Sequence, residues 1–119
     1  MIPSGPKLVL HLEGLVVCIA ACAVYRELGG SWIRFAVLFL APDLFMLGYL
    51  FGKKVGTRLY NSVHTYLAPS ALWLVAYYSS KPVLLPICVI WVAHIGFDRL
   101  LGYGLKYDSD FKDTHLNRV

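Results

Sequence analysis

Four long apolar stretches, separated by short polar ones, set the pattern of the chain. The stretches cover residues 7–25, 32–51, 60–78 and 83–103. Each is close to the ~20 residues that a helix needs to cross the hydrocarbon core of a membrane. Membrane strands would instead alternate polar and apolar residues over about ten positions, and the sequence shows no such alternation. The pattern therefore predicts four transmembrane helices.

The polar connections are short, which restricts how the predicted helices are arranged. Residues 26–31 contain a glycine-rich turn, residues 52–58 a basic loop, and residues 79–82 a turn that ends in proline. Short connections favour antiparallel neighbours in a helix bundle. We therefore predict one all-α integral membrane domain, a four-helix bundle of up-down-up-down order, followed by a cytoplasmic tail at residues 104–119.

Composition agrees with a membrane protein. Hydrophobic residues make up 58% of the 119 positions and charged residues 15%, against roughly 25% charged residues in soluble domains. A soluble chain of this length could not bury so much apolar surface. The net charge of +4 does not indicate nucleic-acid binding, because the basic residues lie at the ends of the apolar stretches, where membrane topology and anionic lipid place them.

Lysine and arginine are distributed unevenly between the two ends of the predicted bundle. The end that holds both termini carries Lys7, Lys53, Lys54, Arg58, Arg99, Lys106, Lys112 and Arg118, and the other end carries Arg26, Arg34 and Lys81. The positive-inside rule places the richer end in the cytoplasm. We therefore expect both termini to be cytoplasmic.

Three glycines recur at a spacing of four residues, at Gly48, Gly52 and Gly56. Small residues at this spacing let two membrane helices approach closely. The stripe is therefore either the seam of a homodimer or a packing surface inside one bundle.

Ionisable side chains interrupt the apolar stretches. Such groups are costly at membrane depth and usually mark a functional site. His94 and Asp98 lie four residues apart, so they share one face of a helix. The other three predicted helices carry Glu13, Asp43 and His64. In the predicted topology, all four helices contribute ionisable groups to the cytoplasmic half of the bundle.

These residue types are those of a metal site. Imidazole and carboxylate groups are ligands for zinc, iron and manganese, and helix bundles build such sites from carboxylates and closely spaced His/carboxylate pairs. We expect His64, His94 and Asp98 to bind a divalent metal. Glu13 or Asp43 would be a further ligand or the general base. The metal would activate water against a lipid phosphate or ester.

Several polar residues near the same end are candidates for substrate binding. They are Asn61, Arg99, Tyr103, Lys106 and His115. Of these, Arg99, Tyr103 and Lys106 would hold the head group of a substrate drawn from the membrane. The leading hypothesis is a metal-dependent hydrolase of a lipid-like substrate, with membrane lipid as its partner.

Two other functions stay open. Chains of histidine and carboxylate also relay protons or bind ions, so the protein could be a dimeric transporter or channel with Asp43 and Glu13 as the titrating groups. A buried polar network could also hold four helices in register without catalysis, as in a structural or accessory membrane protein.

The tail has two interpretations. Gly102 and Gly104 should end the last helix near the membrane surface. The residues after Gly104 form either a solvated terminus or a segment that folds back. In the second case Phe111 and Leu116 pack on the bundle and present Asp113 or His115 to the site.

Three stretches together resemble a bacterial membrane family known as domain of unknown function 4260. They are residues 93–107 continued by Phe111 and residues 114–116, residues 42–49 beginning Pro42-Asp43, and residues 60–66. The resemblance implies a small multi-helix protein of the bacterial inner membrane and no established activity. It also makes residues 114–116 part of the family pattern, which favours the folded-back tail.

A fainter resemblance concerns membrane-bound metal-dependent hydrolases. Those proteins carry an early histidine, a Pro-Asp-Leu-Asp element and a later His-Arg-Gly element. His11 and the run Pro42-Asp43-Leu44 match loosely, but Phe45 stands at the position of the second aspartate and no His-Arg-Gly is present later in the chain. This departure removes one ligand from the pattern.

Overall fold

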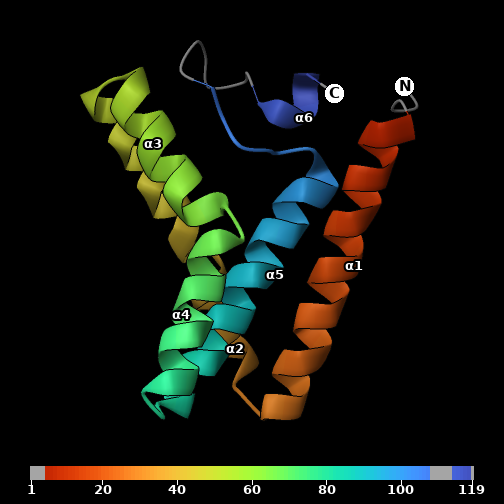
Figure 1. Cartoon of the computed structure of the whole chain (residues 1–119), viewed down its shortest axis with the longest axis vertical. Coiled ribbons are helices and arrows are strands. Elements are labelled where there is room, and N and C mark those ends of the chain that lie inside the picture. Colours follow the sequence, from red (N-terminus) through yellow and green to blue (C-terminus); the bar gives the residue numbers. More distant parts are fainter. Residues whose placement is uncertain (1–4, 108–113, 119) are drawn as a thin grey trace.

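The structure is a computed structural model that describes residues 5–107 and 114–118. The described residues form helices and no strand. In chain order these are α1 (Gly5–Leu28), α2 (Trp32–Phe39), the 3-10 helix η1 (Ala41–Phe51), α3 (Lys53–His64), α4 (Leu67–Tyr78), the short η2 (Pro82–Leu84), α5 (Leu85–Leu101) and α6 (His115–Arg118), as Figure 1 shows.

Within the described ranges, three helical stretches are long and apolar enough to cross a membrane. They are Gly5–Leu28, Trp32–Phe51 and Pro82–Leu101. Their surfaces carry many exposed large apolar side chains, as a lipid environment requires. The predicted all-helical membrane fold is confirmed at this level, while a fourth complete span remains a prediction.

Helices α1 and α5 pack backbone to backbone through two glycines. A Cβ atom added to Gly14 would lie 2.6 Å from the carbonyl oxygen of Gly96, and one added to Gly96 would lie 2.9 Å from that of Gly14. Small residues allow this approach between membrane helices. The two helices lie side by side along most of their length (Figure 1).

The second span changes its helix type halfway. Helix α2 ends at Phe39, and the chain continues through Leu40 as the eleven-residue 3-10 helix η1. Pro42 lacks an N–H group and its ring conflicts with the carbonyl four residues earlier, so the α-helical pattern cannot continue through it. Runs of 3-10 helix longer than three or four residues are uncommon, and a 3-10 stretch within a helix often marks a hinge or a strained sequence.

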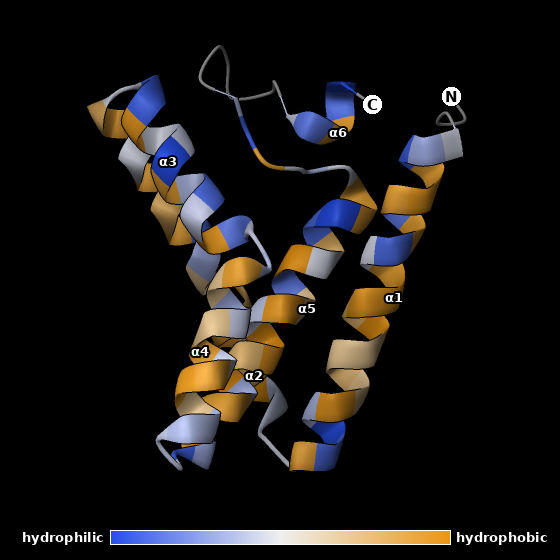
Figure 2. Cartoon of the chain, in the orientation of Figure 1, coloured by the Kyte–Doolittle hydropathy of each residue, from blue (hydrophilic) through white to orange (hydrophobic). Residues whose placement is uncertain are grey.

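The predicted third helix at residues 60–78 is instead two helices. The presumed basic loop is already helical, because α3 begins at Lys53 directly after Gly52, which turns the chain with a φ of 113°. Helix α3 ends at His64, Thr65 is extended, and α4 begins at Leu67. Pro69 explains the break, since its ring excludes an α-helical carbonyl at Thr65. Figure 2 shows that α3 is more hydrophilic than α4.

Two of the glycines at the spacing of four serve contacts within the chain. A Cβ atom on Gly48 would lie 2.6 Å from the Leu59 side chain and 3.3 Å from the Cα of Gly56, and one on Gly56 would overlap the Tyr49 ring. These glycines therefore pack η1 against α3, and Gly52 forms the turn between them. A homodimer through this stripe stays a prediction.

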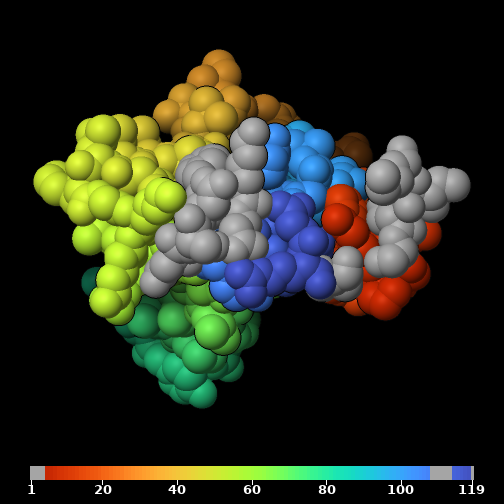
Figure 3. All heavy atoms as spheres, turned by 90° about the horizontal axis from the view of Figure 1, so that it is seen from above, coloured from red at the N-terminus to blue at the C-terminus, as the bar shows by residue number. Residues whose placement is uncertain are grey.

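The C-terminal segment folds back onto the bundle. Helix α5 ends at Gly102 in the left-handed conformation, as the glycines predicted. Lys106 then pairs with Thr114 in an antiparallel bridge, and the side chain of Leu116 is fully buried. Seen from above, α6 lies beside the start of α1 (Figure 3). The expected roles of Phe111 and Asp113 fall outside the described residues.

Candidate metal centre

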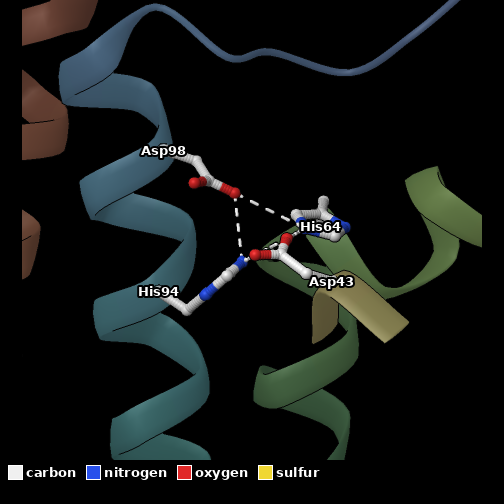
Figure 4. Close-up of side chains that lie close together, drawn as sticks. All are labelled: Asp43, His64, His94 and Asp98. Carbon is white, nitrogen blue, oxygen red and sulfur yellow. Dashed lines mark hydrogen bonds and ion pairs between the residues drawn. The ribbon is translucent and has the colours of Figure 1, made fainter. Parts of the chain in front are cut away.

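Four side chains from three parts of the chain converge at one point. Asp43 comes from η1, His64 from the end of α3, and His94 and Asp98 from successive turns of α5 (Figure 4). One ligand atom of each lies within 4.8 Å of all the others. Of the four, His64, His94 and Asp98 were the expected metal ligands, and Asp43 was the expected ligand or base.

The distances within this cluster have the size that a metal ion imposes. His64 Nε2 lies 3.3 Å from Asp43 Oδ1 and 3.4 Å from Asp98 Oδ2, and His94 Nε2 lies 3.2 Å and 3.1 Å from the same two atoms. The two Nε2 atoms are 3.2 Å apart. Ligands about 2.0–2.1 Å from a tetrahedral ion are separated by about 3.3–3.4 Å. These five separations fit such an ion, and the two carboxylates lie within 4.8 Å of each other.

With both histidines neutral, hydrogen bonds between the four groups cannot satisfy every atom at the centre of the cluster. His64 Nδ1 lies 2.8 Å from the carbonyl oxygen of Tyr60, which can only accept, so Nδ1 carries the proton. In the neutral ring Nε2 is then a bare lone pair that faces a second imidazole and two carboxylates. A single proton on Nε2 could point to only one of them. The centre of the cluster therefore calls for a cation, either a metal ion or protons on the rings.

The histidine rings are held in place by their surroundings. The Tyr60 ring stacks on His64 with 3.8 Å between centroids and 7° between planes. Phe39 meets the His94 ring edge-on at 5.0 Å. The Phe39 backbone also lies close to the His94 ring, but His94 Nδ1 has no partner among the described residues within ordinary hydrogen-bond geometry. A fixed partner on the second nitrogen is typical of metal-bound histidine, and His64 has one.

Two irregularities in the helices position Asp43 and His64 in the cluster. The change to 3-10 helix at Leu40 sets the direction of Asp43, and the break at Thr65 places His64 at a helix end. The second break frees backbone carbonyls, which must be satisfied inside a membrane. Trp91 Nε1 donates to the Val63 carbonyl at 2.6 Å, and Arg99 donates to that of His64 at 3.5 Å. Helix α5 thus supplies two ligands and the donors that stabilise the break.

Three of the four side chains in the cluster are largely buried, and only Asp43 is substantially exposed. The exposed fractions are 3% for the His64 side chain, 2% for His94 and 14% for Asp98, but 40% for Asp43. Two carboxylates would also neutralise a divalent ion, which lowers the cost of its burial. Any exchange of ligands at this site would occur on the Asp43 side.

Other predicted site residues lie outside the cluster. Glu13 is exposed on α1, among apolar side chains. Asn61 exchanges two hydrogen bonds with the backbone of Lys106, at 2.7 and 2.8 Å, and so anchors the C-terminal segment. His115 Nδ1 accepts the N–H of Leu105 at 2.8 Å in the same segment. These three residues are therefore not part of the cluster.

Three predicted substrate-binding residues border the cluster or its surroundings. Arg99 contacts the carbonyl of His64 and lies over the Tyr66 ring at 5.2 Å. The Lys106 ammonium lies 4.5 Å from the centre of the Tyr60 ring, on which His64 stacks. Tyr103 is exposed and lines a polar cavity.

The sequence did not suggest a role for two residues that hold the His64 region in place, Tyr60 and Trp91. Tyr60 lies four positions before His64, so helical spacing alone could have suggested that it contacts the histidine. Trp91 bonds to Val63 across two helices. No spacing in the sequence signals that contact, because it depends on where α3 breaks.

No curated protein and no solved structure matches this chain. The family described as "Domain of unknown function (DUF4260)" matches residues 7–119, which is nearly the whole length. The resemblance seen in the sequence is thereby confirmed, and the chain belongs to this family.

Proposed function

We propose that Asp43, His64, His94 and Asp98 bind a divalent metal ion, zinc, iron or manganese, and that the protein uses it to hydrolyse a lipid-like substrate. One observation carries the proposal. Four side chains from three elements converge, and five of the separations between their nitrogen and oxygen atoms are 3.1–3.4 Å, close to those around a tetrahedral ion.

Catalysis needs a coordination position for water. Four protein ligands close a tetrahedral zinc site, whereas catalytic sites keep one position open. Asp43 is the ligand that can provide it, because its side chain is 40% exposed and the other three are nearly enclosed. It would give up its place to a water molecule while the other three residues hold the ion.

The reaction would depend on the metal and this carboxylate. A divalent ion held by His64, His94 and Asp98 would supply Lewis-acid activation of a water molecule and of the substrate oxygen. Asp43 would accept the proton released by the water that attacks the ester carbon or phosphorus, and would return it to the leaving alcohol oxygen as its bond breaks. The products would be an acid and an alcohol.

An apolar cavity supports a lipid-like substrate. It measures about 190 Å³, and its lining includes Pro42 and Phe45 on either side of Asp43, Val63 before His64, and Trp91. An acyl chain in this cavity would lie beside the open side of the metal. A lipid can reach such a site from within the bilayer, whereas a soluble molecule is scarce there.

The charge distribution supports an orientation in which both described ends face the cytoplasm, as expected for a protein of the bacterial inner membrane. Both described ends of the chain, at the start of α1 and in α6, lie at one end of the bundle (Figure 1). That end also carries most of the lysine and arginine residues, which favours its position in the cytoplasm.

Metal content tests the first step. The protein would be purified in detergent without chelator, and bound metals would be measured by mass spectrometry for the wild type, His64→Gln, His94→Gln and the control His115→Gln. We expect near-stoichiometric metal in the wild type and control, and loss in the two cluster variants. Absence of metal from all four, even after incubation with zinc, iron(II) and manganese, would exclude the metal site.

Hydrolysis tests the second step. Short-chain chromogenic esters and phosphate monoesters would be assayed with the metal-loaded protein, the chelated protein and Asp43→Asn. We expect activity only with metal, and a loss of at least about 100-fold in Asp43→Asn, as for a residue in acid–base catalysis. Glu13→Gln serves as a matched carboxylate control. Activity that survives chelation would contradict the proposed mechanism.

A further inference from the structure

A second polar site lies above the metal centre, where the C-terminal segment meets α1. It is a cavity of about 510 Å³ whose polar lining comes from the start of α1, the end of α5 and the folded-back segment. The polar side chains that line it are Lys7, His11, Tyr103, Lys106, Thr114 and Asn117.

Every one of these side chains can donate a hydrogen bond, and two carry a positive charge. Within residues 5–107 and 114–118, no carboxylate lines the cavity. Such a lining suits an anion with several acceptor oxygens. Phosphate is the anion of this kind that membrane substrates carry, and lysine binds it through charge-assisted hydrogen bonds.

His11 gives an independent sign of a missing partner. Its Nδ1 lies 2.8 Å from the carbonyl oxygen of Leu100, so Nδ1 carries a proton. Its Nε2 is buried and has no hydrogen-bond partner among the described residues. Gly102 packs directly against this ring, since a Cβ there would lie 3.1 Å from His11 Cε1. His11 also lines the cavity, so a phosphate there would be a candidate partner for Nε2 after a small movement of the ring.

Lys106 connects this cavity to the metal centre. Its side chain is buried, with 6% of the residue exposed, and its ammonium lies 4.5 Å from the Tyr60 ring centre. Tyr60 in turn stacks on the metal-centre residue His64. Two hydrogen bonds from Asn61 fix the Lys106 backbone. Burial lowers the pKa of Lys106, and a bound anion would favour its charged form.

We propose that this cavity binds the phosphate group of a phosphorylated lipid, next to the metal centre. The assignment of that lipid as the substrate rests on the proposed function, but phosphate binding itself does not require the metal. Exposed apolar residues flank the cavity on α1 and α5, including Leu8, Leu12 and Leu101, so acyl chains would lie along the outside of the bundle. Free phosphate offers the same chemistry and is the alternative source.

Three probes separate these sources. Binding of dioctanoyl phosphatidic acid, dioctanoylglycerol and inorganic phosphate would be measured by calorimetry, with full-length protein in a non-ionic detergent. We expect phosphatidic acid to bind at least about 10-fold more tightly than dioctanoylglycerol, which has the same chains without phosphate. Binding of phosphatidic acid and of phosphate with equal affinity would support the anion site and assign it to soluble phosphate. Equal binding of the two lipids would overturn the proposal.

Variants locate the binding. Lys106→Met keeps the backbone contacts with Asn61, and we expect it to weaken phosphatidic acid about 10-fold or more, as loss of a charge-assisted hydrogen bond does. His11→Gln should weaken it as well. Lys81→Gln, at the opposite end of the bundle, is the matched control. An equal effect of Lys81→Gln would show that binding depends on general surface charge and would overturn the proposal.

Metal content distinguishes the failure of this proposal from failure of the metal centre. Each measurement would be repeated on the same protein after chelation. Binding that persists without metal supports the phosphate site whatever the metal result. Stoichiometric metal without phosphatidic acid or phosphate binding would overturn the phosphate site and leave the metal centre standing.

Discussion

Two halves of the bundle are built in different ways. Helices α1 and α5 are long, uninterrupted and packed glycine to glycine, and we call them the continuous pair. The stretch from α2 to α4, which we call the broken half, contains a change to 3-10 helix and a break at Thr65. The continuous pair contributes His94 and Asp98 at a fixed helical spacing. The broken half contributes Asp43 and His64, one from each irregularity.

The two halves would therefore contribute differently to the candidate metal centre. Helical geometry fixes the relative position of His94 and Asp98, so half of the ligand set is preorganised. Asp43 and His64 depend on how the broken half is held against α5. Irregular backbone at membrane depth is tolerated where protein buries it, and it recurs at binding sites in membrane proteins. We expect the two halves to respond differently to substitution.

The largest effect should come from the glycine contact of the continuous pair. In Gly96→Val, the new side chain meets the backbone of α1, which cannot move aside as a flexible side chain could. We expect the free energy of unfolding to fall by at least about 3 kcal/mol, the upper end of the usual cost of overpacking, seen as a lower melting temperature in detergent. Gly5→Val is the control, because nothing lies within 4 Å of a Cβ there. Equal melting temperatures would refute the rigid role of this pair.

The next effect compares one carboxylate from each half. Asp98→Asn should lower metal affinity more than Asp43→Asn, because Asp98 is 14% exposed and Asp43 is 40% exposed, so water can replace Asp43 more easily. We expect more than a 100-fold loss for Asp98→Asn, since a ligand should matter more than the outer partners worth about 10–100-fold. Metal titration against a competing chelator measures both. The reverse order would place the open position at Asp98.

A smaller effect should appear when the break at Thr65 loses its support. Trp91→Phe removes the N–H group that bonds to the Val63 carbonyl, which leaves that carbonyl unsatisfied near the cluster. We expect metal affinity to fall by about 10–100-fold, as it does when a residue that holds a ligand in place, without binding the ion, is replaced. Trp73→Phe, on the exposed face of α4, should leave affinity unchanged. If both variants behave alike, α5 does not hold the break in place.

The smallest effect concerns pH and the folded-back segment. Burial, with a smaller contribution from Arg99, lowers the pKa of His115, whose Nδ1 must be unprotonated to accept the Leu105 N–H. The contact is therefore fully present above the unfolded-state pKa of about 6.5. It is lost as the pH falls through the lower folded-state pKa. The protection of the Leu105 amide, which is its intrinsic exchange rate divided by its observed rate at the same pH, should fall at acid pH. In His115→Phe it should show no such titration.

The local sequence was sufficient to predict the main features of the continuous pair. The apolar stretches specified helices in a membrane, and the spacing of His94 and Asp98 placed them on one face, because an α-helix fixes the relation of residues four apart. Gly102 ended the last helix as expected, because only glycine adopts its positive φ without strain. These features depend on neighbours in the chain.

The remaining features depended on contacts between distant residues. Proline positions indicated irregular helices but not where Asp43 and His64 would point, which packing against α5 decided. The rotation of α1 shows the same limit. Because Gly14 faces Gly96, the neighbouring Glu13 turns outward, away from the cluster. The sequence by itself determined which residues could bind a metal, and only the tertiary structure decided which four meet, since helix rotation and helix breaks are set by the partner surfaces.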